Sequence, residues 1–188
     1  IAAAKELGNY DTYISKVVLR NDAEINTFFD YIALYREING MRAISSWNKK
    51  NPALVDKTNK IILEAYEQAQ FAVLHLEENL DHGVIQAINV ITKKSIILID
   101  NALHRHNKKG CFFICSLLNL GEYFMTSGAG TTIDPNSSAG KSALTLLKKH
   151  LVKIRKAKEP FDPDVRECVR EIYGFILRAG LLRNHSVG

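Results

Sequence analysis

The chain has 188 residues, of which 46% are hydrophobic and 24% are charged, and its net charge is +5. This is the composition of a globular protein that can bury a core without metals or disulfides, so we expect a folded rather than a disordered chain. No apolar run reaches the roughly 18 residues of a membrane-spanning helix, so we expect no transmembrane segment. We expect residues 1–188 to form a single domain, and the start at Ile1 suggests a fragment of a longer protein.

Cysteine and histidine usage gives no sign of a disulfide framework or a metal centre. The three cysteines are an odd and low number for a chain of this size. Cys111 and Cys115 lie among apolar neighbours, so we expect them to be buried small hydrophobic residues. His104 and His106 would point to opposite sides of a helix, and no other ligand completes a zinc set. We therefore expect no cofactor, no metal and a reducing, cytoplasmic location.

The first fifty residues are predicted to be mainly helical. Residues 10–19 are expected to form one helix, and Asn21 or Asp22 can cap the next. In that second helix the apolar side chains recur at spacings of three and four: Ile25, Phe28, Ile32 and Tyr35. Gly40 is expected to end it, and a short helix is predicted over residues 41–48.

The middle of the chain has no proline between residues 53 and 134, which permits long helices. Residues 55–81 show apolar positions alternating three and four apart, and residues 84–106 show a similar stripe, so both segments are predicted to be helices. Ser95–Ile99 has the composition of a buried strand, but its flanks lack turn residues, which favours helix. Residues 111–126 are apolar nearly all round, as expected of a central helix.

The last third is predicted to contain a long loop and two more helices. Residues 127–140 are rich in Gly, Ser and Thr and are expected to be a loop. A helix is predicted over residues 141–157, and another begins with Asp162 as its cap and Pro163 at its first position and ends at Gly180. Together these elements predict an all-α fold, a helical bundle of seven to eight helices with one long interhelical loop.

The excess positive charge lies at the C-terminal end of the chain. Residues 141–188 contain 11 Lys and Arg against 5 Asp and Glu, a net +6, whereas residues 1–140 contain 14 against 15. Within the predicted helix 141–157, Lys149, Lys153 and Lys156 share a face, and Lys141 and Lys148 belong to the same basic run. Such a face can bind an acidic protein surface or nucleic-acid phosphates, or it can simply be solvated.

Two short motifs resemble those of known families. Gly128, Ala129 and Gly130 are similar to the Gly-Ala-Gly-Ala loop of bacterial effector exchange factors for Rho-family GTPases, although the fourth position here is Thr131. That resemblance implies insertion of small residues at a GTPase switch. Arg178 and His185 fit the Arg-x(4–6)-His spacing of HEPN ribonucleases, which implies an RNA-binding or RNA-cleaving site.

No Ser-His-Asp, Cys-His or paired-carboxylate set can be assembled from spacing alone. We therefore expect a macromolecular interaction module that docks a protein partner through the basic helix and the adjacent loop. The alternatives are a small-GTPase regulator and a HEPN-like RNA-binding or ribonuclease domain. The sequence leaves open whether any catalysis occurs and how many copies assemble. The expected binding residues are Gly128, Ala129, Gly130, Lys141, Lys148, Lys149, Lys153 and Lys156.

Overall fold

The computed structural model describes residues 1–52, 56–106, 109–157 and 159–181. It is 46% helix and 28% strand, so the all-α helical bundle predicted from the sequence is wrong. The helical elements are α1 (Ala2–Leu7), α2 (Asp22–Asp30), the π-helical turn η1 (Tyr31–Tyr35), α3 (Ala43–Lys50), α4 (Lys57–Glu67), α5 (Asn101–His106), α6 (Ser138–Lys156) and α7 (Pro163–Ala179). The described helices include none with the length and apolar run needed to cross a bilayer.

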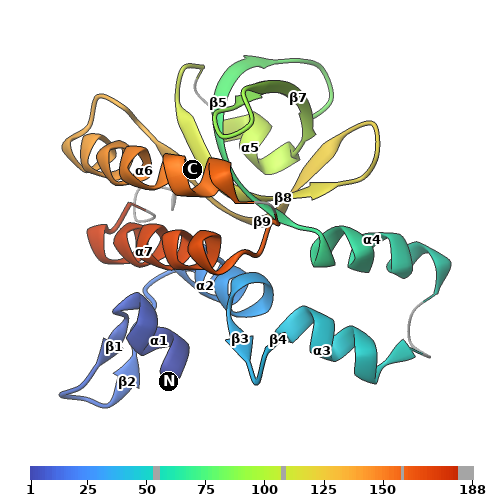
Figure 1. The fold of residues 1–188 in the computed structure, drawn as a ribbon. Helices are drawn as coiled ribbons and strands as arrows, with labels where there is room; N and C mark the ends of the chain where they lie inside the picture. Colours follow the sequence, from blue (N-terminus) through green and yellow to red (C-terminus); the bar gives the residue numbers. More distant parts are fainter. Residues whose placement is uncertain (53–55, 107–108, 158, 182–188) are drawn as a thin grey trace.

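Five strands form a closed barrel, which lies in the upper part of the view in Figure 1. They are β5 (Gln70–Asn79), β6 (Val84–Asn89), β7 (Lys94–Ile99), β8 (Phe112–Asn119) and β9 (Phe124–Ile133). The strand order is β5-β6-β7-β9-β8, returning to β5, and only the β7–β9 pair is parallel. With α5 between the third and fourth strands, this is the Greek-key barrel of the OB fold. Two short hairpins, β1 (Tyr10–Asp11) with β2 (Lys16–Val17) and β3 (Glu37–Ile38) with β4 (Met41–Arg42), precede it.

Two strands in the middle of the chain, β5 and β8, were missed because they are buried on both faces. Ala72, Leu74 and Leu76 of β5 point into the barrel, whereas Phe71 and Val73 pack against the helices outside it. A strand buried on both sides reads as a continuous apolar run and loses the alternation that distinguishes it from a helix. The structure has α4 and β5 in the predicted helix 55–81, and β6, β7 and α5 in the predicted helix 84–106. The predicted helix 111–126 contains β8 and the start of β9.

The same alternation divides β8 between two cores. Phe113, Cys115 and Leu117 lie inside the barrel, and Ile114 and Leu118 face the helical layer. The second core is formed mainly by residues of α1, α2, η1, α6 and α7 packed on the outer wall of the barrel. In Figure 1, α3 and α4 lie to one side of this layer.

Local signals at helix ends predicted several boundaries correctly. Asn21 caps α2 by accepting a hydrogen bond from the Glu24 amide, and Asp162 caps α7, whose first residue is Pro163. Gly180 ends α7 in the left-handed conformation, with φ of 65°. By contrast, the helix predicted over residues 10–19 is wrong, because this segment forms the β1–β2 hairpin. Residues 127–133 of the predicted 127–140 loop belong to β9.

We expect Gly130→Ala to destabilise the fold by about 1–3 kcal/mol, the usual cost of overpacking. A Cβ atom at Gly130 would collide with the ring of Phe113 and lie 2.9 Å from the carbonyl oxygen of Ile114. Urea unfolding followed by circular dichroism measures the change. Ser142→Ala, at an exposed position of α6, is the control and should stay within about 0.5 kcal/mol of wild type. An unchanged free energy of unfolding for Gly130→Ala would contradict this packing.

Candidate functional site

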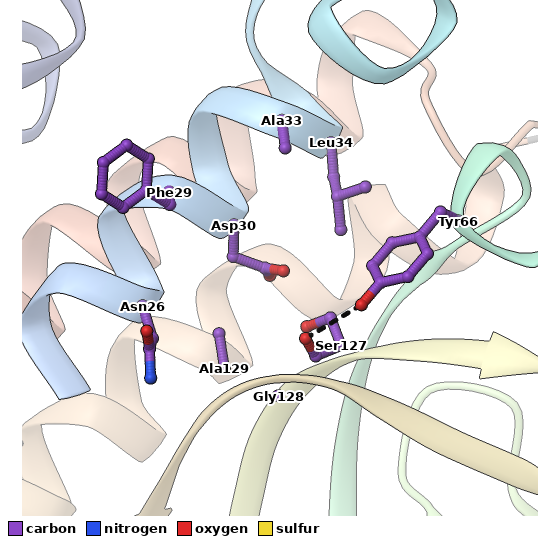
Figure 2. A pocket seen from close by; sticks show the side chains of 9 residues that line it. All are labelled: Asn26, Phe29, Asp30, Ala33, Leu34, Tyr66, Ser127, Gly128 and Ala129. Atoms are coloured by element: carbon purple, nitrogen blue, oxygen red, sulfur yellow. Dashed lines mark hydrogen bonds between the residues drawn. The ribbon is translucent and has the colours of Figure 1, made fainter. Parts of the chain in front are cut away.

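A hollow of about 360 Å³ opens between α2, η1 and strand β9 (Figure 2). We call it the α2–β9 hollow, and its volume is within the range of small-ligand pockets. It is lined by Asn26, Phe29, Asp30, Ala33, Leu34, Tyr66, Ser127, Gly128 and Ala129. Helix α2 and η1 supply the first five of these residues, α4 supplies Tyr66, and β9 supplies the last three.

A bulge in β9 shapes the lower wall of the hollow. Cys115 pairs with Gly130 and Leu117 pairs with Thr126, so the single residue Ser116 lies opposite the three residues 127–129. Extra residues on one strand bend it and interrupt its ladder. Gly128 has φ of 87°, a conformation that is strained for residues with a side chain. We call residues 127–129 the β9 bulge, and it turns this stretch of backbone toward α2.

Asp30, at the base of the hollow, is the most unusual of its residues. Its side chain is a buried carboxyl, and the residue is only 7% exposed. The Ser116 hydroxyl donates a hydrogen bond to Asp30 Oδ2 at 2.5 Å, and the Tyr173 hydroxyl donates to the same oxygen at 3.0 Å. The hydroxyl of Tyr35 lies 2.8 Å from Ser116 Oγ. Asp30 therefore joins α2 to β8, η1 and α7 through one buried polar network.

Burial raises the pKa of the Asp30 carboxyl above its usual value of 3.8, because the charged form loses its hydration. Hydrogen bonds from Ser116, Ser127 and Tyr173 lower it in part. Burial, followed by the nearby Asp30 charge, also raises the pKa values of the Tyr35 and Tyr173 phenols well above 10. A buried acid with a raised pKa beside an open hollow is a common property of functional sites.

Apolar and aromatic side chains form the upper walls. Phe29 is 59% exposed at the rim, whereas Leu34 is buried. The Tyr66 hydroxyl donates a hydrogen bond to the carbonyl oxygen of Ser127 at 3.3 Å, which ties the end of α4 to the β9 bulge. The hollow thus combines one buried acid with rings and methyl groups around it.

The structure places the predicted binding residues in two separate regions. Gly128 and Ala129 line the α2–β9 hollow, and Gly130 follows them in β9. None of the predicted lysines lines the hollow, because all of them lie on α6. Lys149 pairs with Glu171 at 3.6 Å, and Lys153 lies 3.9 Å from Asp164 and 3.8 Å from Glu167. Helix α7 thereby neutralises part of the predicted basic face.

Of the two residues of the HEPN-like spacing, the structure describes only Arg178. Arg178 donates a hydrogen bond from Nη1 to the carbonyl oxygen of Leu7 at 2.8 Å and packs beside Gly8 and Gly174. His185 lies outside the described residues. The observed role of Arg178 is to attach α7 to the end of α1.

The sequence did not predict one cluster that has the residue types of a catalytic triad. Cys168 Sγ lies 3.1 Å from His150 Nδ1, and His150 Nε2 lies 2.9 Å from a carboxylate oxygen of Glu171. Cys168 has no exposed surface, and burial raises the pKa of its thiol to about 11. The nucleophilic thiolate is therefore scarce at neutral pH and unreachable by a substrate. This cluster joins α6 to α7 rather than forming an active site.

The sequence offered one overlooked signal for the candidate site. Asp30 is the only charged residue between Glu24 and Arg36, in a stretch rich in aromatic and aliphatic residues. An acid in such a stretch is either solvated or buried with hydrogen-bonding partners. Its partners Ser116 and Tyr173 lie 86 and 143 residues further along the chain, so no local pattern indicates them. Among the described residues, no group of three or more His, Cys, Asp or Glu is placed to hold a metal.

Fold and site together describe an OB-type barrel with a helical cover and a hollow at their junction. The chain belongs to the family of unknown function DUF7986, whose model matches residues 1–160. The match includes every residue of the α2–β9 hollow and all of α6. No curated protein and no solved structure matches the chain.

We expect Asp30→Asn to remove a pH-dependent component of stability. Because folding raises the pKa of Asp30, the folded state binds this proton more tightly than the unfolded chain does. The resulting stabilisation is complete below the unfolded pKa of about 3.9 and is lost as the pH rises through the folded pKa. Urea unfolding at several pH values should show the free energy of wild type falling relative to Asp30→Asn as the pH rises.

The matched control for this experiment is Asp22→Asn, which replaces an exposed acid on the same helix. Its difference from wild type should not fall in the same way. If the free energy of unfolding of wild type instead rose relative to that of Asp30→Asn as the pH rises, folding would lower the pKa of Asp30.

Proposed function

We propose that the protein is a binding module that docks a protein partner over the α2–β9 hollow and seats a basic side chain of that partner against Asp30. The observation that supports this best is the buried carboxyl at the base of an opening with aromatic and aliphatic walls. Few groups complement such a site, because a buried carboxylate needs both a positive charge and hydrogen-bond donors.

A lysine or arginine side chain matches each part of the hollow. Its charged end would meet the Asp30 carboxyl, and its methylene stem would pack on Ala33 and Leu34. Tyr66 offers an aromatic ring at the wall of the hollow, and such rings attract cations over their faces. Phe29 and Asn26 are exposed beside the opening and are available to contact the surface around that side chain.

The hydrogen bonds that Ser116, Tyr35 and Tyr173 already make around Asp30 support binding rather than catalysis. The Ser116 hydroxyl is fully buried and bonded to Asp30, so it is not presented to a substrate. Tyr35 and Tyr173 are equally buried, and their raised pKa values keep both phenols protonated at neutral pH. These groups hold the carboxyl in place, which is what a preorganised binding site requires.

A small GTPase is one partner class compatible with this proposal. Gly128 and Ala129, which resemble part of the exchange-factor loop, lie in the β9 bulge at the edge of the hollow. Replacing Gly128 and Ala129 with larger residues would then abolish docking together with any nucleotide exchange. The HEPN-like alternative has no comparable support in the geometry, since Arg178 is bound to the Leu7 carbonyl.

Selection from a random peptide library displayed on phage tests the proposal. Wild-type protein should enrich peptides with Lys or Arg at one fixed position, and Asp30→Asn should lose that preference. The variant should bind the selected peptides at least about 10-fold more weakly, because truncating one partner of a buried charge pair costs about 2–5 kcal/mol. Asp22→Asn should behave as wild type. Enrichment of peptides without a basic residue, or equal binding by Asp30→Asn, would refute the proposal.

A further inference from the structure

Helix α6 has two exposed sides that differ in their electrostatic environment. It contains six basic residues and no acidic one: Lys141, Lys148, Lys149, Lys153, Arg155 and Lys156. Lys149 and Lys153 face the acids of α7, which lies beside α6 in Figure 1. Lys141, Lys148 and Arg155 recur every seven residues and so lie along another side of the helix. Within the described structure, Lys141, Lys148 and Lys156 have no acidic oxygen within 4.0 Å.

A second basic segment is fixed next to this side of α6. Arg155 donates hydrogen bonds to the carbonyl oxygens of Val90 at 2.7 Å and Ile91 at 3.1 Å. This clamps the β6–β7 turn onto α6, and the turn closes with Lys93 in the left-handed conformation at φ of 61°. Lys93 and Lys94 are both exposed. Two basic stretches that are about fifty residues apart in the sequence therefore meet on one surface.

We infer that this surface, formed by Lys93, Lys94, Lys141, Lys148 and Arg155, binds the phosphate backbone of a nucleic acid. We call it the α6 basic face. Lysine rows without acidic neighbours attract phosphodiesters by charge and release their counterions on contact. The inference concerns a site separate from the α2–β9 hollow, whose lining includes none of these residues.

The composition of the α6 basic face favours nucleic acid over the other anionic partners. A membrane-bound helix buries an apolar side in the lipid, but the apolar side of α6, with Leu147 and Ile154, is buried in the protein core. Val152, 58% exposed, is the only large hydrophobic residue exposed on α6. A protein interface would need a larger apolar centre with few charges.

Fluorescence anisotropy with labelled mixed-sequence 20-nucleotide single-stranded RNA and DNA tests the inference. About four phosphate contacts predict an affinity that falls about 50-fold between 50 and 200 mM salt. The triple variant Lys94→Glu, Lys141→Glu and Lys148→Glu should lose at least about 10-fold in affinity at 50 mM salt. Lys16→Glu, Lys49→Glu and Lys50→Glu change the net charge equally at exposed positions elsewhere and should lose no more than about threefold.

Circular dichroism first establishes that both triple variants are folded. Asp30→Asn should bind the oligonucleotides as wild type does, which separates this site from the proposed docking hollow. The inference is refuted if neither oligonucleotide binds at 50 mM salt, or if both triple variants lose affinity equally. It is also refuted if phosphatidylserine-containing vesicles bind to this surface and the oligonucleotides do not.

Discussion

The buried network around Asp30 joins the two halves of this molecule. A single carboxylate oxygen accepts hydrogen bonds from Ser116 on β8 and Tyr173 on α7, while Tyr35 of η1 contacts the same serine. The barrel wall and the helical layer are otherwise joined mainly by apolar packing, which is non-directional. Buried polar partners must meet in one geometry or leave an unsatisfied group, so the network fixes how the helices sit on the barrel. The same geometry leaves the carboxyl at the base of the α2–β9 hollow.

The parts of the fold that are predictable from sequence are those set by local chemistry. Asn21, Asp162, Pro163 and Gly180 mark helix ends because capping and backbone preference act within a few residues. The barrel was missed because its hidden strands depend on distant partners. Phe71 and Leu74 are both buried, one against helices and one inside the barrel, and no local pattern distinguishes that arrangement from a buried helix.

The residues of the candidate site also differ in how far the sequence predicted them. Gly128 and Ala129 were predicted as binding residues from their resemblance to an exchange-factor loop, and the structure shows them in a strand bulge rather than in a long loop. Asp30 was visible only as an isolated acid in an apolar stretch, and its partners lie too far along the chain to be paired with it by spacing. The basic run was visible in full, but the sequence could not show which of its lysines the acids of α7 would neutralise.

A carbon-13 NMR titration of the Asp30 side-chain carboxyl, with and without n-butylammonium, tests the central claim most directly. We predict that Asp30 in the free protein titrates at a pKa above the usual 3.8. The cation should move this pKa downward because it stabilises the ionised form. A carboxyl that titrates at or below its usual pKa, or one that does not respond to the cation, would contradict the claim that Asp30 is a buried acid poised to receive a basic group.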